Sequence, residues 1–105
     1  MASVKWIKLS TDLFNNRKIK QIRKMPEGDA VIGIWLQLMC LAGDVNNGGL
    51  IYFSKDIPYT DEMLANEFDR PVNLIRLALK TFETFEMVYL TDNIICVRCS
   101  PHKRG

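Results

Sequence analysis

Apolar side chains recur at helical spacing in two segments of the first half of the chain. In residues 16–24, Ile19 and Ile22 form a narrow apolar stripe between basic residues, which predicts a short amphipathic helix. In residues 30–44, apolar side chains cover most of the helical circumference, so we expect a central core helix. The asparagine- and glycine-rich run 46–49 is a strong turn signal and ends this helix.

Short extended segments flank these helices. Residues 4–9 have the composition of a short strand or extended arm, and residues 50–53 that of a single strand. A connection through residues 54–59 follows. Side-chain oxygens can cap both helices at their N-termini, from residues 10–12 for the first helix and from Asp29 for the second.

The second half of the chain has a regular order of elements. Thr60 can cap a helix over 61–68, a turn at 69–71 follows, and apolar spacing predicts a helix from 72 to about 85. Two apolar β-forming runs, 87–90 and 94–97, then flank a tight turn and predict a hairpin. Strand, helix, short turn, helix and hairpin is the order of a winged helix.

The fold class predicted is therefore α+β, mainly α: a helix-turn-helix with a β-hairpin wing, plus preceding N-terminal helices. A chain of 105 residues is large enough for one hydrophobic core and too short for two. We expect one domain over residues 1–97, and a flexible tail or truncation remnant over 98–105.

Composition places the chain among soluble globular proteins, with 48% hydrophobic and 25% charged residues. The longest mostly apolar run, residues 30–42, falls short of the roughly 20 residues that cross a bilayer. The N-terminus lacks the pattern of a signal peptide. We therefore expect a cytoplasmic protein that does not contact a membrane.

The sequence predicts neither a metal site nor an enzyme. Cys96 and Cys99, with His102, have the spacing of half a metal site, but no second ligand pair exists and Cys40 lies in the apolar helix. Three cysteines without a secretory signal also argue against a disulfide framework. No phosphate-binding glycine loop or nucleophile with a base is found, so we expect no cofactor and no catalysis.

Charge is distributed unevenly along the chain. Residues 1–24 carry seven basic residues against one acidic residue, a net +6, whereas residues 25–105 carry seven against eleven, a net −4. This asymmetry favours an anionic partner for the N-terminal region. The alternative is a solvated helix face without a partner.

Three polar residues share a stripe on the last predicted helix, Asn73, Arg76 and Lys80. Asparagine pairs with adenine, arginine with guanine, and lysine with phosphate or guanine, so this stripe suits the major groove of DNA. Thr81 and Thr84 are candidates for contacts with the DNA backbone. Acidic residues on this helix and on the preceding helix, 61–68, weaken this interpretation, because phosphate contacts supply much of the affinity for DNA. The remaining phosphate contacts are then expected from the first basic helix, at Arg17, Lys18, Lys20, Arg23 and Lys24.

Several short segments spread over residues 3–97 form a specific combination: 4–9, 16–23, 28–32 with Trp35 and Leu38, 48–52 and 59–65. Together they resemble the N-terminal domain of phage replisome organizer proteins, a DnaD-like replication initiation family. The resemblance implies a winged-helix module that binds double-stranded origin DNA and self-associates, in a phage protein acting in the cytoplasm of the host cell. It also implies that host replication proteins are engaged through a further C-terminal region.

Self-association also has support from the residues. Trp6 and Ile7 in the arm, and the apolar surplus of the helix 30–44, predict the interface of a homodimer or higher oligomer. The alternative is that Trp6 and Trp35 cap the core of a monomer. Two other functions stay open: an oligomerisation scaffold whose DNA contacts lie elsewhere, and a winged-helix transcriptional regulator.

Overall fold

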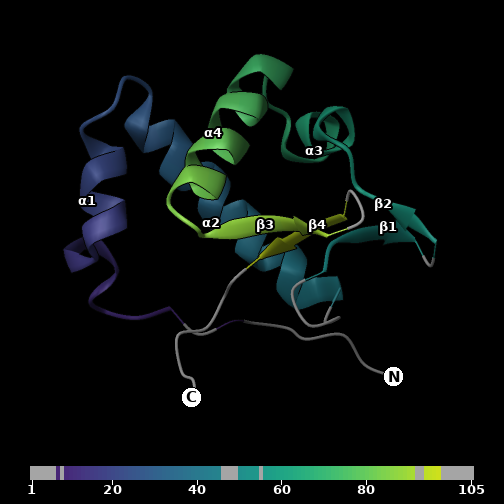
Figure 1. The fold of residues 1–105 in the computed structure, drawn as a ribbon, viewed down its shortest axis with the longest axis horizontal. Helices are drawn as coiled ribbons and strands as arrows, with labels where there is room; N and C mark the ends of the chain where they lie inside the picture. The colour runs from purple at the N-terminus through teal and green to yellow at the C-terminus, as the bar shows by residue number, and fades with distance from the viewer. Residues whose placement is uncertain (1–6, 8, 46–49, 55, 92–93, 98–105) are drawn as a thin grey trace.

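The computed structural model describes residues 7, 9–45, 50–54, 56–91 and 94–97, with the side chains of 44 and 45 left out. Figure 1 shows its order of elements. A 3₁₀ turn at Leu13–Asn15 precedes α1 (Arg17–Arg23), α2 (Gly28–Val45), β1 (Tyr52–Ser54), β2 (Ile57–Pro58), α3 (Asp61–Phe68), α4 (Val72–Thr84), β3 (Val88–Thr91) and β4 (Ile94–Val97).

The two N-terminal helices begin at other residues than the capping pattern predicts. Asn16 caps α1, where its side-chain oxygen accepts hydrogen bonds from the backbone N–H groups of Lys18 and Ile19. The hydroxyl of Ser10 instead accepts from the N–H of Asp12, ahead of the 3₁₀ turn. The start of α2 is at Gly28, so Asp29 lies inside its first turn and favours the helix dipole there.

The helix-turn-helix unit follows the prediction closely. The hydroxyl of Thr60 accepts from the N–H of Met63 at 3.2 Å and caps α3. The helix ends at Asp69, which adopts the left-handed conformation with φ of 56°. Pro71 then precedes α4, where its fixed φ of −60° suits a helix start. The bounds expected for both helices are confirmed to within one residue.

The wing is an antiparallel pair of β3 and β4, with Val88 opposite Val97 and Thr91 opposite Ile94. The chain before β1 borders the other edge of β4, because Leu50 bridges to Cys96 and the N–H of Ile51 donates to the carbonyl of Ile95 at 3.0 Å. The wing therefore carries a short third segment, residues 50–51, beside β4.

The prediction of one continuous strand over residues 50–53 is wrong. After Ile51 the chain leaves the wing, and Tyr52–Ser54 pairs with Ile57–Pro58 in a separate hairpin. The residues expected to form a plain connection thus contain β2. Pro58 lacks an N–H, and an edge strand of two residues accommodates it. The rings of Phe53 and Tyr59 are in edge-on contact at 5.7 Å.

A tight reversal joins α4 to the wing. The N–H of Met87 donates to the carbonyl of Phe82 at 2.7 Å and that of Glu86 to Glu83 at 3.0 Å, which is a Schellman ending. Glu86 occupies the left-handed position with φ of 62°. This turn brings Met87 and Val88 into the core at the start of β3.

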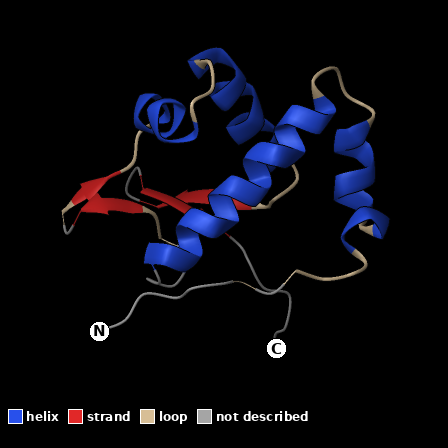
Figure 2. Ribbon diagram, turned by 180° about the vertical axis from the view of Figure 1, so that it is seen from behind, coloured by secondary structure: helices blue, strands red, loops and turns tan. Residues whose placement is uncertain are grey.

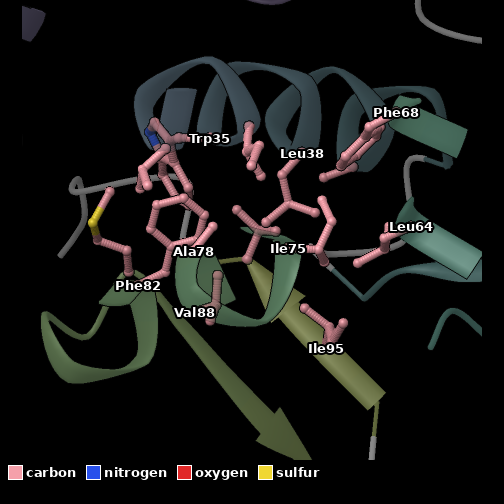
Figure 3. Close-up of a cluster of buried hydrophobic side chains, with 14 of the residues drawn as sticks. Trp35, Leu38, Leu64, Phe68, Ile75, Ala78, Phe82, Val88 and Ile95 are labelled. Carbon is pink, nitrogen blue, oxygen red and sulfur yellow. The ribbon is translucent and has the colours of Figure 1, made fainter. Parts of the chain in front are cut away.

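The core forms where α2 and α4 meet (Figure 3). Trp35 on α2 packs against Phe82 on α4, with ring centroids 5.1 Å apart. Leu38, Ile75 and Phe82 are completely buried. Each such side chain contributes about 1.5–3 kcal/mol of stabilisation through its removal from water.

The helices have a fixed order around α2. α1 and α4 both pack on α2, and α3 packs on α4. Figures 1 and 2 show α3 on one side of α4 and α1 on the other. The predicted fold class is confirmed: the chain is α+β and mainly helical, in an arrangement compatible with a winged helix.

Candidate nucleic-acid interface

The outer face of α4 brings together the three residues predicted to meet DNA. Asn73, Arg76 and Lys80 are all exposed, while the opposite face of the helix carries its buried residues. The prediction that Thr81 contacts the DNA backbone is wrong, because Thr81 is buried and its hydroxyl donates to the carbonyl of Leu77 at 2.8 Å. Thr84 is exposed and its hydroxyl donates to the carbonyl of Lys80.

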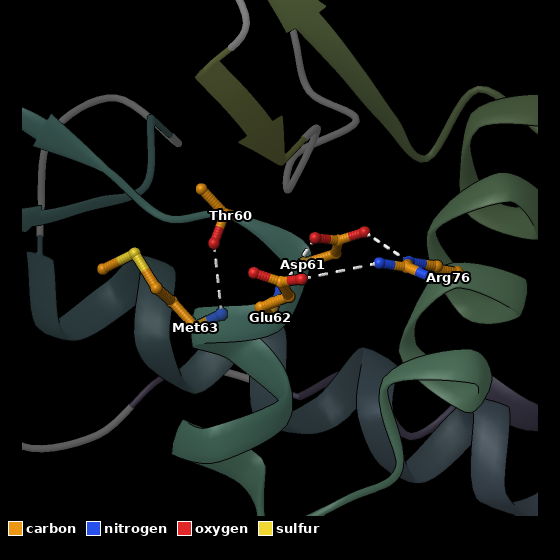
Figure 4. Close-up of polar contacts among 5 residues, drawn as sticks. All are labelled: Thr60, Asp61, Glu62, Met63 and Arg76. Carbon is orange, nitrogen blue, oxygen red and sulfur yellow. Dashed lines mark hydrogen bonds and ion pairs between the residues drawn. The ribbon is translucent and has the colours of Figure 1, made fainter.

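Arg76 is engaged by the first turn of α3 (Figure 4). Its Nε donates to Oδ2 of Asp61 at 2.7 Å, and its Nη2 lies 3.8 Å from Oε2 of Glu62. The Arg76 side chain remains 53% exposed and that of Asp61 34%. The hydrogen bond from Arg76 lowers the pKa of Asp61 below its ordinary value, and the same bond raises the pKa of Arg76.

The contact between Arg76 and Asp61 was not predicted from the sequence, and the local structure explains it. Thr60 caps α3 and fixes its first turn, and the packing of α3 on α4 brings that turn beside the middle of α4. From the sequence, Asp61 is an acidic residue in the first turn of a helix, where it favours the dipole of that helix. Its partner lies fifteen residues further along the chain, and no local spacing pattern reports such a pair.

The pKa of Asp61 provides a direct test of the ion pair. We expect a carboxyl NMR titration to give a value below the ordinary 3.8, because Arg76 stabilises the charged form. Since the folded pKa is lowered, the pair's contribution to stability is present above the unfolded value and is lost as the pH falls through the folded one.

In Arg76→Ala the pKa of Asp61 should rise toward 3.8. Lys80→Ala is the control, because it removes a cation one turn further along α4 that makes no ion pair with Asp61. A pKa unchanged by Arg76→Ala would contradict the contact.

The basic surface of α1 consists of Arg17, Lys18, Lys20, Arg23 and Lys24, which are all exposed. α1 itself contains no acidic residue. Within the described ranges none of the five cations has an ion pair, and the guanidinium of Arg23 lies over the ring of Phe14 at 5.5 Å. This surface thus has the unpaired positive charge that a polyanion requires.

The predicted site residues therefore form two groups. Asn73, Arg76 and Lys80 lie on α4, with α3 on one side of that helix, and α1, which carries the basic residues, lies on the other (Figures 1 and 2). No local pattern in the sequence indicates this placement, because it depends on how both helices pack on α2.

Two side-chain hydrogen bonds fix the helix-turn-helix unit on the rest of the fold. Nε of Arg70, in the turn, donates to Oε1 of Gln37 on α2 at 3.1 Å. The hydroxyl of Tyr59 donates to Oε1 of Glu67 on α3, also at 3.1 Å. Arg70 is therefore hydrogen-bonded to α2. Lys80 on α4, in contrast, is exposed.

The predicted arm is described only in part. Trp6 lies outside the described residues. Ile7 is half-buried and its Cγ2 approaches the backbone of Gly43 on α2, at 2.6 Å from where a Cβ would lie. Leu9, two residues later, is 54% exposed.

The cysteines and acidic residues form no metal centre in the part of the chain that the structure describes. Cys96 is buried on β4, and Cys40 is exposed on α2. Cys99 and His102 lie outside the described residues. Among the helices described, none combines the length and apolar character needed to cross a membrane.

Comparison with known proteins gives one match. Residues 6–100 match the family model described as the N-terminal phage replisome organiser. No curated protein and no solved structure matches the chain.

Proposed function

Since this chain belongs to the N-terminal phage replisome organiser family, and so has its role in the initiation of phage DNA replication, we propose that it binds double-stranded DNA at an origin. The family resemblance seen in the sequence is confirmed. The observation that carries the proposal is an exposed α4 face with Asn73 and Lys80, beside an α1 surface whose five cations have no ion pair with any described residue. The protein acts in the cytoplasm of the host cell, as a binding module rather than an enzyme.

The two surfaces have different tasks in this proposal. The outer face of α4 enters the major groove, which is about 12 Å wide and admits one helix. The cations of α1 neutralise backbone phosphates to one side of that groove. Each phosphate neutralised steepens the dependence of affinity on salt, by about 0.9 in the slope of log K against log salt. The α1 surface thus supplies affinity and α4 supplies selectivity.

Binding to duplex DNA at several salt concentrations tests this division. We expect Arg17→Ala and Lys18→Ala each to weaken binding to every duplex and to reduce the salt slope by about 1. We expect Lys80→Ala and Arg76→Ala to weaken binding as well, with a loss that depends on the sequence of the duplex. Gln21→Ala on α1 is the matched control, because Gln21 is exposed and uncharged.

Two outcomes would contradict the proposal. If Arg76→Ala and Lys80→Ala leave the affinity unchanged, α4 does not read the groove. If neither the wild type nor any variant binds a duplex while the protein elutes as a stable oligomer, the chain is an assembly scaffold. The acidic pair beside Arg76 is the observation that favours this second function.

Self-association is part of both functions. We propose a homodimer or higher oligomer formed through the arm that carries Trp6 and Ile7, and the exposed Leu9 beside it supports an apolar contact there. Light scattering on Trp6→Ala/Ile7→Ser should show a smaller mass than the wild type at equal concentration. Engagement of host replication proteins stays a prediction from the family resemblance.

A further inference from the structure

The guanidinium of Arg76 has two functional edges, and the protein occupies one of them. The edge with Nε and Nη2 faces Oδ2 of Asp61 at 2.7 Å and Oε2 of Glu62 at 3.8 Å. Within the described chain Arg76 has no further hydrogen-bond partner. The end of its fork, with one hydrogen on each Nη, is therefore a pair of parallel donors without a partner among the described residues.

The surroundings of Arg76 disfavour phosphate. Asp61 and Glu62 stand beside it on α3, and Glu83 lies on the same flank of α4 as Asp61, since both line one groove of about 320 Å³. A phosphate placed here would face the carboxylates of Asp61 and Glu62 at short range, and like charges at short range repel. A guanine edge offers two neutral acceptors, O6 and N7, and avoids this repulsion.

We propose that Asp61 is a positioning residue that makes Arg76 a reader of guanine in the major groove instead of a phosphate contact. The carboxylate holds the guanidinium by its inner edge and aims the outer pair of N–H donors at the base. A hydrogen-bonded carboxylate also fixes the side-chain rotamer, so the fork is ordered before DNA arrives. This inference rests on the proposed DNA binding and adds the base that is read.

The experiment uses the whole chain and two kinds of duplex. The wild type first selects a site from a pool of random duplexes, and each G·C pair of that site is then replaced in turn by A·T. Affinities for these duplexes and for unselected DNA are measured by fluorescence anisotropy over a range of salt. The variants are Asp61→Asn, Arg76→Ala, the double variant, and Glu62→Gln as a matched control, since Glu62 is 76% exposed and lies further from Arg76.

In the wild type, one G·C replacement should weaken binding about ten-fold or more, the usual effect of a lost bidentate contact. In Asp61→Asn this penalty should fall below about three-fold, since the fork is no longer aimed at the base. Binding to unselected DNA should tighten and the salt slope should steepen by about 1, because Arg76 becomes free to bind phosphate. Glu62→Gln should keep the guanine penalty, and Asp61→Asn should change nothing further in an Arg76→Ala background.

Three results would overturn the inference while leaving DNA binding intact. The first is a full guanine penalty in Asp61→Asn. The second is an equal loss of affinity for all duplexes at an unchanged salt slope, which would assign Asp61 to the packing of α3 on α4. A wild type that binds every duplex with one affinity also overturns it, whereas a wild type that binds none removes the proposed function itself.

Discussion

Replacing Phe82 by alanine is expected to lower the free energy of unfolding by about 3–5 kcal/mol. Phe82 is fully buried and packs against Trp35 at a centroid distance of 5.1 Å, so the substitution removes a ring from the contact between α2 and α4. The cavity left behind adds to the lost transfer free energy, because the surrounding helices relax only in part. Urea denaturation followed by circular dichroism measures the change.

Phe53→Ala is the matched control, because it makes the same substitution at a side chain that is 58% exposed. Its loss should be below about 1 kcal/mol, from the edge-on contact with Tyr59. Globular domains are stable by only about 5–15 kcal/mol, so Phe82→Ala should leave a measurable unfolded fraction at moderate temperature. Equal losses in the two variants would mean that the α2–α4 contact is not the centre of the core.

Replacing Gly28 by alanine is expected to destabilise the fold by about 1–3 kcal/mol, although alanine is the better helix former. A Cβ at Gly28 would lie 2.3 Å from the carbonyl oxygen of Ile22 and 2.9 Å from that of Arg23. Both neighbours are backbone atoms, so no rotamer change relieves the overlap. The end of α1 must therefore move away from α2.

Gly33→Ala in the same helix separates the steric effect from helix propensity. A Cβ there would meet Nη2 of Arg70 at 3.0 Å, and the end of a long side chain can move aside. This variant should be neutral or more stable by about 0.5–1 kcal/mol, the usual gain of alanine over glycine in a helix. If Gly28→Ala behaves in the same way, the close approach of α1 to α2 is not a constraint.

The helix-turn-helix unit could be predicted because its signals are local. Thr60 caps α3 from the position expected, and Pro71 stands directly before α4. The buried residues of α4 recur at helical spacing, so its inner and outer faces follow from the sequence. The wing was predictable for the same reason, since two short β-forming runs flank a tight turn.

The misplaced elements depend on pairing between distant segments. Tyr52 and Phe53 have the β propensity of a strand, but propensity does not state which segment a strand pairs with. Residues 50–51 lie beside β4, which is more than forty positions further along the chain. Tyr52–Ser54 instead pairs with Ile57–Pro58, which follows it closely in the sequence. The contact of Asp61 with Arg76 was missed on the same ground, because it exists only once α3 packs on α4.

The charge asymmetry was visible in the sequence, and its geometry was not. The packing of α1 and α4 on α2 puts the five cations, which have no ion pair among the described residues, to one side of α4 and the acidic start of α3 to the other. Among the described residues this separation is an electric dipole across the face of α4. In the DNA binding that we propose, the field of the polyanion turns this dipole before contact, so α1 approaches the phosphates first and α4 then enters the groove. The order of encounter then follows from the placement of two helices in the fold.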